Sequence, residues 1–143
     1  PVIFDNVFTL PQRDTDPHDI HFRAAGILHK AGVKIAHSEA MGSWGASRVR
    51  NIVYAAAKSI AHGLPREAAL RSLTLHPAQM LNVADRLGSL TPKKEATFIA
   101  VDGDIFDIRT NVKHMWIDGK KVSLQSRHTR LYEKYKNRPK LIK

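Results

Sequence analysis

The sequence of 143 residues contains no cysteine and no apolar run that approaches the length of a membrane span. The first absence excludes a disulfide scaffold, a thiolate metal site and a cysteine nucleophile, and it leaves a cytoplasmic or a periplasmic location equally open. The second excludes a membrane-spanning helix, which needs about 18 or more consecutive apolar residues. With 43% hydrophobic and 25% charged residues, the composition is that of a globular domain.

The start of the chain lacks both an initiator methionine and a secretory signal. It opens instead on Pro1-Val2-Ile3-Phe4, which is already apolar and strand-like. We therefore expect the sequence to be a piece of a longer protein, although its length is sufficient for one domain with a buried core.

Acidic residues are scarce at the other end, where Glu133 is the single acid beyond Lys120. Most of the net charge of +10 comes from nine bases there: Lys120, Lys121, Arg127, Arg130, Lys134, Lys136, Arg138, Lys140 and Lys143. We expect a solvated extension, and nucleic acid is not the expected partner. Binding to an RNA, an anionic surface or an acidic partner stays open, because Tyr132 and Tyr135 lie among the charges and could stack on bases. On a helix, the spacing of the two tyrosines equally suits packing against the rest of the domain.

The apolar periodicity changes once along the chain. The first half alternates strand-like and helix-like segments, as in the βα units of a parallel sheet, and the second half is typical of antiparallel strands. The expected strands cover residues 1–10 (with an exit), 33–36, 96–101, 112–117 and 120–122, and the expected helices cover 17–31, 47–62, 66–74, 78–81 and 127–137.

Local signals sharpen several of these boundaries. Asp16-Pro17 suits the start of the first helix, with aspartate as N-cap and proline in the first turn. Gly32 and Gly63 are expected to end the first two helices, and residues 37–46 are expected to form a loop. Asp118-Gly119 is the two-residue turn of a β-hairpin.

Five motifs in a fixed order carry a family resemblance. They are GLPREAAL at 63–70, TLHPAQML at 74–81, VADRLGSL at 83–90, ATFIAVDGDIFD at 96–107 and WIDGKKV at 116–122. Together they resemble the C-terminal portion of the metal-dependent amidohydrolase superfamily, most closely its imidazolonepropionase-like and prolidase-like branch. Residues 93–95 (KKE) stand where that family has Gly-Lys-Asp, so we expect the turn there to take another form.

The resemblance implies an α/β fold, the C-terminal fragment of a (β/α)₈ TIM barrel with the C-terminal strands of a composite β-sandwich. Residues 1–87 would be the last strands and helices of the barrel, 88–125 the sandwich strands, and 126–143 a basic helix or tail. Residues 1–3 and 33–36 would be barrel strands seven and eight. Because these strands would lack their neighbours, we expect the chain to pair with a copy of itself or with the missing N-terminal half.

The activity that the resemblance implies is hydrolysis of C–N bonds in small amide, cyclic amide or peptide substrates by metal-activated water. Zinc or another divalent metal would be bound mainly by residues upstream of Pro1, since the chain has no His-x-His. We expect the fragment alone to bind no cofactor and to be inactive. The alternative is a non-catalytic relative that acts as a ligand-binding or polyanion-binding module.

The site residue that this segment of the family supplies is an aspartate at the end of strand eight. A gapless register places Ala40 there, with Glu39 one residue early and His37 three early. Glu39 recovers the catalytic role only if the strand exit is bulged, and otherwise is a solvated loop carboxylate. His37 and Trp44 are candidates for substrate contact in the same loop.

A weaker candidate is the pair His18 and His21 in the acidic stretch DTDPHDIH. Spacing of three places both imidazoles on one face of a helix, where a divalent cation could bridge them. Helix-start chemistry, with acids at the positive end of the helix dipole, explains the same residues without a metal.

Overall fold

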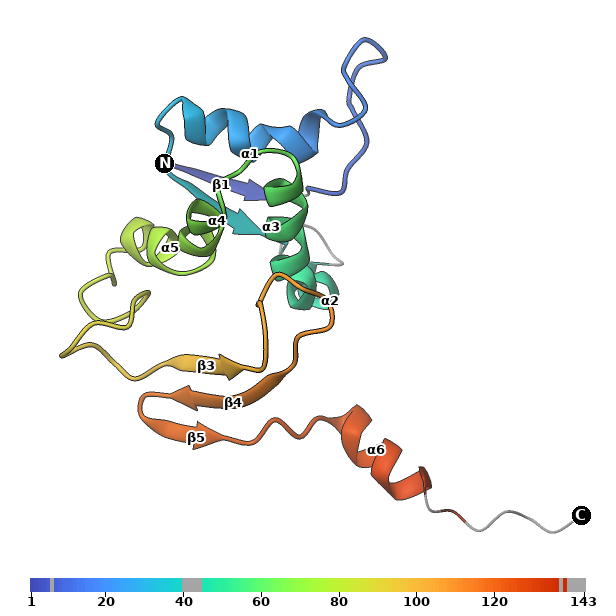
Figure 1. Ribbon diagram of the computed structural model, residues 1–143, viewed down its shortest axis with the longest axis vertical. Coiled ribbons are helices and arrows are strands. Elements are labelled where there is room, and N and C mark those ends of the chain that lie inside the picture. Colours follow the sequence, from blue (N-terminus) through green and yellow to red (C-terminus); the bar gives the residue numbers. More distant parts are fainter. Residues whose placement is uncertain (6, 40–44, 137, 139–143) are drawn as a thin grey trace, which may run out of the picture.

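The computed structural model describes residues 1–5, 7–39, 45–136 and 138 (Figure 1). Helices cover a pair of parallel strands in the first half, and an antiparallel sheet follows in the second. The strands are β1 (Val2–Asp5), β2 (Ile35–Ser38), β3 (Phe98–Val101), β4 (Val112–Ile117) and β5 (Lys120–Val122). The helices are α1 (Ile20–Lys30), α2 (Gly45–Arg48), α3 (Ile52–Ala61), α4 (Arg66–Leu73), α5 (Leu75–Met80) and α6 (Arg127–Lys136). None of these helices is long and apolar enough to cross a membrane.

Strands β1 and β2 are parallel and are connected by α1. Their register runs from Val2 opposite Ile35 to Asp5 opposite Ser38. Because the strands are parallel, both carboxyl ends lie at one edge of the sheet. Within the described part of the chain no further strand pairs with either of them, and Ile3 is 66% exposed.

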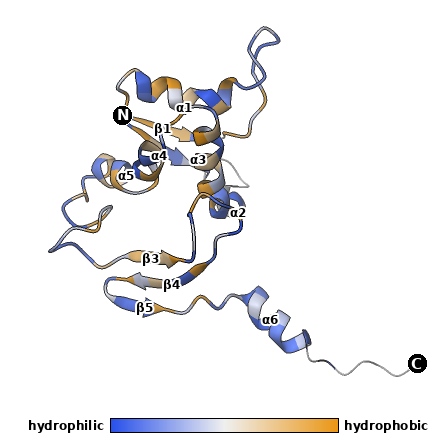
Figure 2. Cartoon of the chain, viewed as in Figure 1, coloured by the Kyte–Doolittle hydropathy of each residue, from blue (hydrophilic) through white to orange (hydrophobic). Residues whose placement is uncertain are grey.

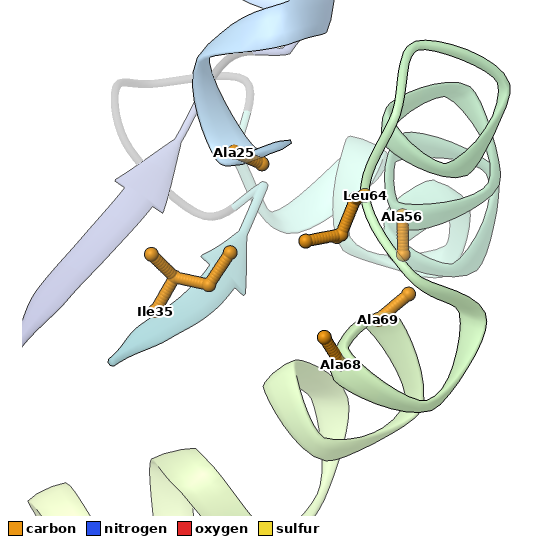
Figure 3. Close-up of a cluster of buried hydrophobic side chains, with 6 residues drawn as sticks. All are labelled: Ala25, Ile35, Ala56, Leu64, Ala68 and Ala69. Atoms are coloured by element: carbon orange, nitrogen blue, oxygen red, sulfur yellow. The ribbon is translucent and has the colours of Figure 1, made fainter. Parts of the chain in front are cut away.

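Small side chains form most of the core between β2 and the helices. The buried cluster consists of Ala25, Ile35, Ala56, Leu64, Ala68 and Ala69 (Figure 3). Alanine leaves little bulk between the elements, so their backbones lie close together. At Gly26 of α1 an added Cβ would lie 3.1 Å from the carbonyl carbon of Gly63, which shows that α1 contacts the turn between α3 and α4 directly.

Three helix predictions were wrong in their boundaries. Helix α5 begins at Leu75 and not at Ala78, because Pro77 lies within its first turn, where a proline is tolerated. Helix α1 begins at Ile20 and not at Pro17, because residues 17–19 form a separate turn in which the Ile20 N–H donates to the Pro17 carbonyl at 3.0 Å. The single helix expected over residues 47–62 is divided, since the 3₁₀ turn η1 (Val49–Asn51) separates α2 from α3. The glycines expected to end α1 and α3 do so: Gly32 has φ +74° and Gly63 has φ +101°.

The second half is a three-stranded sheet in the order β3-β4-β5, antiparallel throughout. The predicted hairpin turn is confirmed: Asp118 and Gly119 both have positive φ, 49° and 72°, as a type I′ turn requires. The rings of Phe98 and Trp116 stack across β3 and β4 with centroids 4.7 Å apart.

The turn at residues 93–95 corrects another expectation. Lys93 itself takes φ +76°, in the left-handed region that favours glycine, so the absence of glycine does not require a different turn. Lys94 holds the turn in place, because its Nζ donates to the Ala84 carbonyl oxygen and, at 2.8 Å, to Ser89 Oγ.

Side chains around Arg66 connect the two halves. Arg66, the first residue of α4, donates to the Asp104 carboxylate, and its guanidinium lies 5.0 Å from the centre of the Phe106 ring. Phe106 also packs against the buried cluster. The arginine holds the pKa of Asp104 below its ordinary range through this hydrogen bond.

Candidate functional site

The carboxyl ends of β1 and β2 bring together the polar side chains that the sequence placed at the strand-eight exit. Ile35 is in the core beneath the helices, and side chains alternate along a strand, so His37 faces the helices as well. Asp5 and Ser38, which are opposite each other in the register, alternate to the other face of the sheet.

His37 lies inside β2, whereas the sequence predicted a loop from this residue onward. The strand continues through Ser38, and the imidazole is only 5% exposed. Its Nδ1 lies 2.7 Å from Ser72 Oγ of α4, and its Nε2 lies 3.1 Å from Ser59 Oγ of α3. His37 therefore connects the strand to two helices, and substrate contact stays a prediction for this residue.

The two serines determine where the imidazole carries its proton. Burial lowers the pKa of His37 to about 4, so the ring is neutral near pH 7 and only one nitrogen donates. Ser72 Oγ donates to the Ala69 carbonyl at 2.6 Å, and so accepts a hydrogen bond from Nδ1–H. The bond from Ser59 Oγ to the Ala55 carbonyl is long at 3.3 Å, which leaves the Ser59 hydroxyl to donate to Nε2.

Glu39 directly follows β2 and is buried, with 3% of its surface exposed. It is therefore not a solvated loop carboxylate. Its Oε1 has no hydrogen-bond partner among the described residues. Burial raises the pKa of Glu39, the positive charge of Arg48 opposes this, and the negative charge of Asp5 raises the pKa further. Such a carboxyl group holds a proton more readily than an exposed one.

Asp5 is the site residue that the sequence reasoning missed. Both of its carboxylate oxygens are buried and lack a hydrogen-bond partner in the described part of the chain. The available signal was its position as the acid that ends the first strand-like run, since the carboxyl ends of parallel strands in α/β folds are where ligands bind. The apolar pattern predicted a strand with its exit over residues 1–10, whereas the resemblance assigned strand seven to residues 1–3 alone; β1 extends to Asp5.

The positions of the other candidates that the structure describes, His18 and His21, do not indicate a function. His18 lies in the turn before α1 and His21 in the first turn of α1; the Nε2 of His21 is buried without a partner among the described residues. The described residues contain no group of three or more ligating side chains that could hold a metal ion, and metal binding by this pair stays a prediction. Trp44, like Ala40, lies outside the residues that the structure describes.

An apolar groove of about 990 Å³ lies between α4–α5 and the β3–β4 pair, lined among others by Leu70, Leu81 and Trp116. Its charged lining residues are Glu67 and Arg71, which bond to each other at 2.5 Å. A paired acid on an exposed helix face is poorly suited to proton transfer, so we place the candidate site at the strand ends.

Comparison with known proteins gives one family match and several similar proteins. The pattern of the family described as "Amidohydrolase family" matches residues 18–122. The chain is 36% identical over 70 residues to "Amidohydrolase tasK" of Hapsidospora irregularis, covering 49% of this chain and 7% of that protein. It is 38% identical over 61 residues to a "Putative N-acetylgalactosamine-6-phosphate deacetylase" of Escherichia coli (strain K12), covering 43% of this chain and 34% of that protein.

A solved structure of an amidohydrolase from Thermotoga maritima MSB8 is also similar, with a TM-score of 0.65 and 29% identity. The similarity covers 78% of this chain and 29% of that one. The chain thus spans about a third or less of the proteins to which it is similar.

Proposed function

Because the chain belongs to the amidohydrolase family, we propose that it forms the closing part of a (β/α)₈ barrel hydrolase that cleaves C–N bonds in amide, cyclic amide or peptide substrates. The observation that carries the proposal is the family match over residues 18–122. In the structure, acids with buried carboxylate oxygens lie at the carboxyl ends of the two parallel strands, Asp5 in β1 and Glu39 directly after β2. Relatives named as an amidohydrolase and a deacetylase support the same bond type. In this proposal β1 and β2 are the last two barrel strands, and residues 88–125 belong to the sandwich. Residues 126–143 form a C-terminal extension that belongs to neither the barrel nor the sandwich.

The family resemblance implies zinc or another divalent metal, and the described residues do not fit such an ion by themselves. Asp5 and Glu39 provide carboxylate oxygens, but no group of three ligating side chains forms within the described ranges. A structural or catalytic zinc site takes at least three protein ligands. The ligands would therefore come from the rest of the proposed barrel, and no step assigned below depends on the ion.

Glu39 is the residue we propose for proton transfer. Its carboxyl group is buried at the strand end, has an oxygen without a partner among the described residues, and has a raised pKa. A raised pKa brings a carboxyl group closer to the pH at which it can both accept and return a proton. We propose that Glu39 takes a proton from the attacking water and delivers it to the departing nitrogen.

The test uses a protein that combines this chain with the remaining barrel strands, assayed against N-acyl, cyclic amide and dipeptide substrates. Glu39→Gln keeps the shape of the side chain and removes its titration. We expect it to lower kcat about 100-fold or more with a much smaller effect on KM, as is typical for a lost general acid–base. Glu67→Gln on the exposed face of α4 is the matched control and should retain activity.

The 143-residue chain alone supplies a second readout. With added zinc we expect no turnover of the same substrates, because the proposed metal ligands lie outside it. Turnover by the isolated chain that Glu39→Ala abolishes would contradict this expectation, and an unchanged kcat for Glu39→Gln in the larger protein would exclude Glu39 as the proton carrier.

A second candidate function is a non-catalytic module that binds a ligand or a polyanion. The specific observation in its favour is the basic helix α6, which is fully outside the core. If the larger protein hydrolyses any C–N substrate, the protein is an enzyme, and α6 is a binding element attached to it.

A further inference from the structure

Helix α6 is separate from the family domain in both sequence and space. The family match ends at residue 122, and α6 begins at Arg127. Figure 1 shows the helix extending away from the rest of the molecule, and Figure 2 shows it as mainly hydrophilic. No residue of α6 is buried. Its side chains therefore do not serve the core of the described structure.

Two kinds of side chain occupy different sides of this helix. His128, Leu131, Tyr132 and Tyr135 follow one another at helical spacings of three, one and three, so they share one face. Arg127, Arg130 and Lys134 follow at three and four and form a basic ridge beside that face. Lys136 lies on the other side of the aromatic face, and Glu133 is the only acid of the helix.

The structure argues against one of the two roles that the spacing of the tyrosines allowed, namely packing against the rest of the domain. Tyr132 is 61% exposed and Tyr135 is 52% exposed, so neither ring packs against the described body of the protein. An ammonium group lies over one face of each ring: Lys136 Nζ is 5.4 Å from the Tyr132 centroid and Lys134 Nζ is 5.5 Å from that of Tyr135. A base stacked on either ring would place its phosphate near a lysine.

We propose that α6 binds single-stranded nucleic acid without sequence preference, with Tyr132 and Tyr135 stacking on bases and the flanking basic residues contacting phosphates. Unpaired bases are required because the rings need an exposed base face. An anionic membrane is the less suitable partner, since Leu131 is the only aliphatic side chain on the aromatic face and a membrane-surface helix needs a larger apolar face. This proposal is independent of the hydrolase activity.

The test measures fluorescence anisotropy of a labelled oligothymidylate with the 143-residue chain over a series of salt concentrations. If the four basic side chains of α6 contact phosphates, the logarithm of the association constant should fall with the logarithm of the salt concentration at a slope of about −3. Tyr132→Ala with Tyr135→Ala should weaken binding about fivefold or more per ring and leave the slope unchanged. Arg130→Gln with Lys134→Gln should reduce the slope by about half.

Lys30→Gln with Lys34→Gln is the control, because it removes the same charge from exposed positions in the body. These two changes should affect the affinity and the salt slope much less than Arg130→Gln with Lys134→Gln does. Circular dichroism of all variants checks that the fold is retained. The proposal is overturned if the tyrosine variant binds like the parent, if the control weakens binding as much as the α6 variant, or if duplex DNA or phosphatidylserine vesicles bind more tightly than the single strand.

Discussion

His37 shows how a single residue couples the strand layer to the helix layer. It bonds to Ser59 and Ser72, which come from different helices, and is neutral because burial lowers its pKa to about 4. Protonation would give both nitrogens a hydrogen to donate and would leave a charge inside the core. Burial of that charge is therefore what favours the neutral ring.

We expect the stability of the protein to decrease as the pH falls from about 6.5 to about 4. The folded pKa of His37 lies below its ordinary value of 6.5, so in this window the unfolded chain binds the proton more readily. The full stabilisation that comes from keeping His37 neutral is present above pH 6.5. By pH 4 roughly 3 kcal/mol of the free energy of unfolding is lost, at about 1.4 kcal/mol for each unit of pKa difference. Urea unfolding across this range measures it.

His37→Asn should remove most of that pH dependence, although it also lowers the stability at pH 7. His29→Asn, at a less buried position near the end of α1, is the control and should keep the slope. An equally steep fall in stability in the His37 variant would show that another group titrates.

At the scale of the elements, the distance between helices depends on residues without bulk. Gly26 of α1 lies against the backbone of Gly63 and Leu64, at the turn that joins α3 to α4. The surrounding cluster is made mainly of alanine (Figure 3). A side chain at position 26 would have to push apart two backbones and not just another side chain.

We expect Gly26→Ala to destabilise the fold by about 1–2 kcal/mol. The added Cβ would lie 3.1 to 3.2 Å from three backbone atoms, and such overpacking typically costs about 1–3 kcal/mol. The higher helix propensity of alanine offsets up to about 1 kcal/mol of this destabilisation. Thermal unfolding compares the variant with Arg23→Ala, an exposed change in the same helix that should have little effect; a Gly26→Ala protein as stable as the parent would show that α1 can move.

At the scale of the whole molecule, the parallel pair β1–β2 has free outer edges in the described structure. Ile3 is 66% exposed although it lies within β1. Backbone groups along a strand edge together with apolar side chains favour pairing with a further strand. In the proposed barrel this partner would be a neighbouring strand, and in the isolated chain it would be another copy.

We therefore expect the purified chain to associate, with a mass by light scattering above the 16.0 kDa of one copy. Ile3→Lys places a charge on the exposed edge and should shift the distribution towards the monomer. Leu10→Lys, at an exposed residue outside the strand, is the control and should not. A monodisperse monomer of the unmodified chain would contradict the expectation.

The sequence alone predicted those features that depend only on residues adjacent along the chain. The order of strands and helices, the glycines that end α1 and α3, and the Asp118-Gly119 turn were all predicted, because each depends on the φ/ψ preferences of a few adjacent residues. The family was recognisable for a related reason, since its motifs are local and occur in a fixed order.

Only the tertiary structure placed His37 against serines 22 and 35 residues away, and Asp5 beside Ser38. It also buried Glu39 and left Tyr132 and Tyr135 exposed. These outcomes depend on which faces pack together and in which register, and an isolated stretch of sequence does not contain that information.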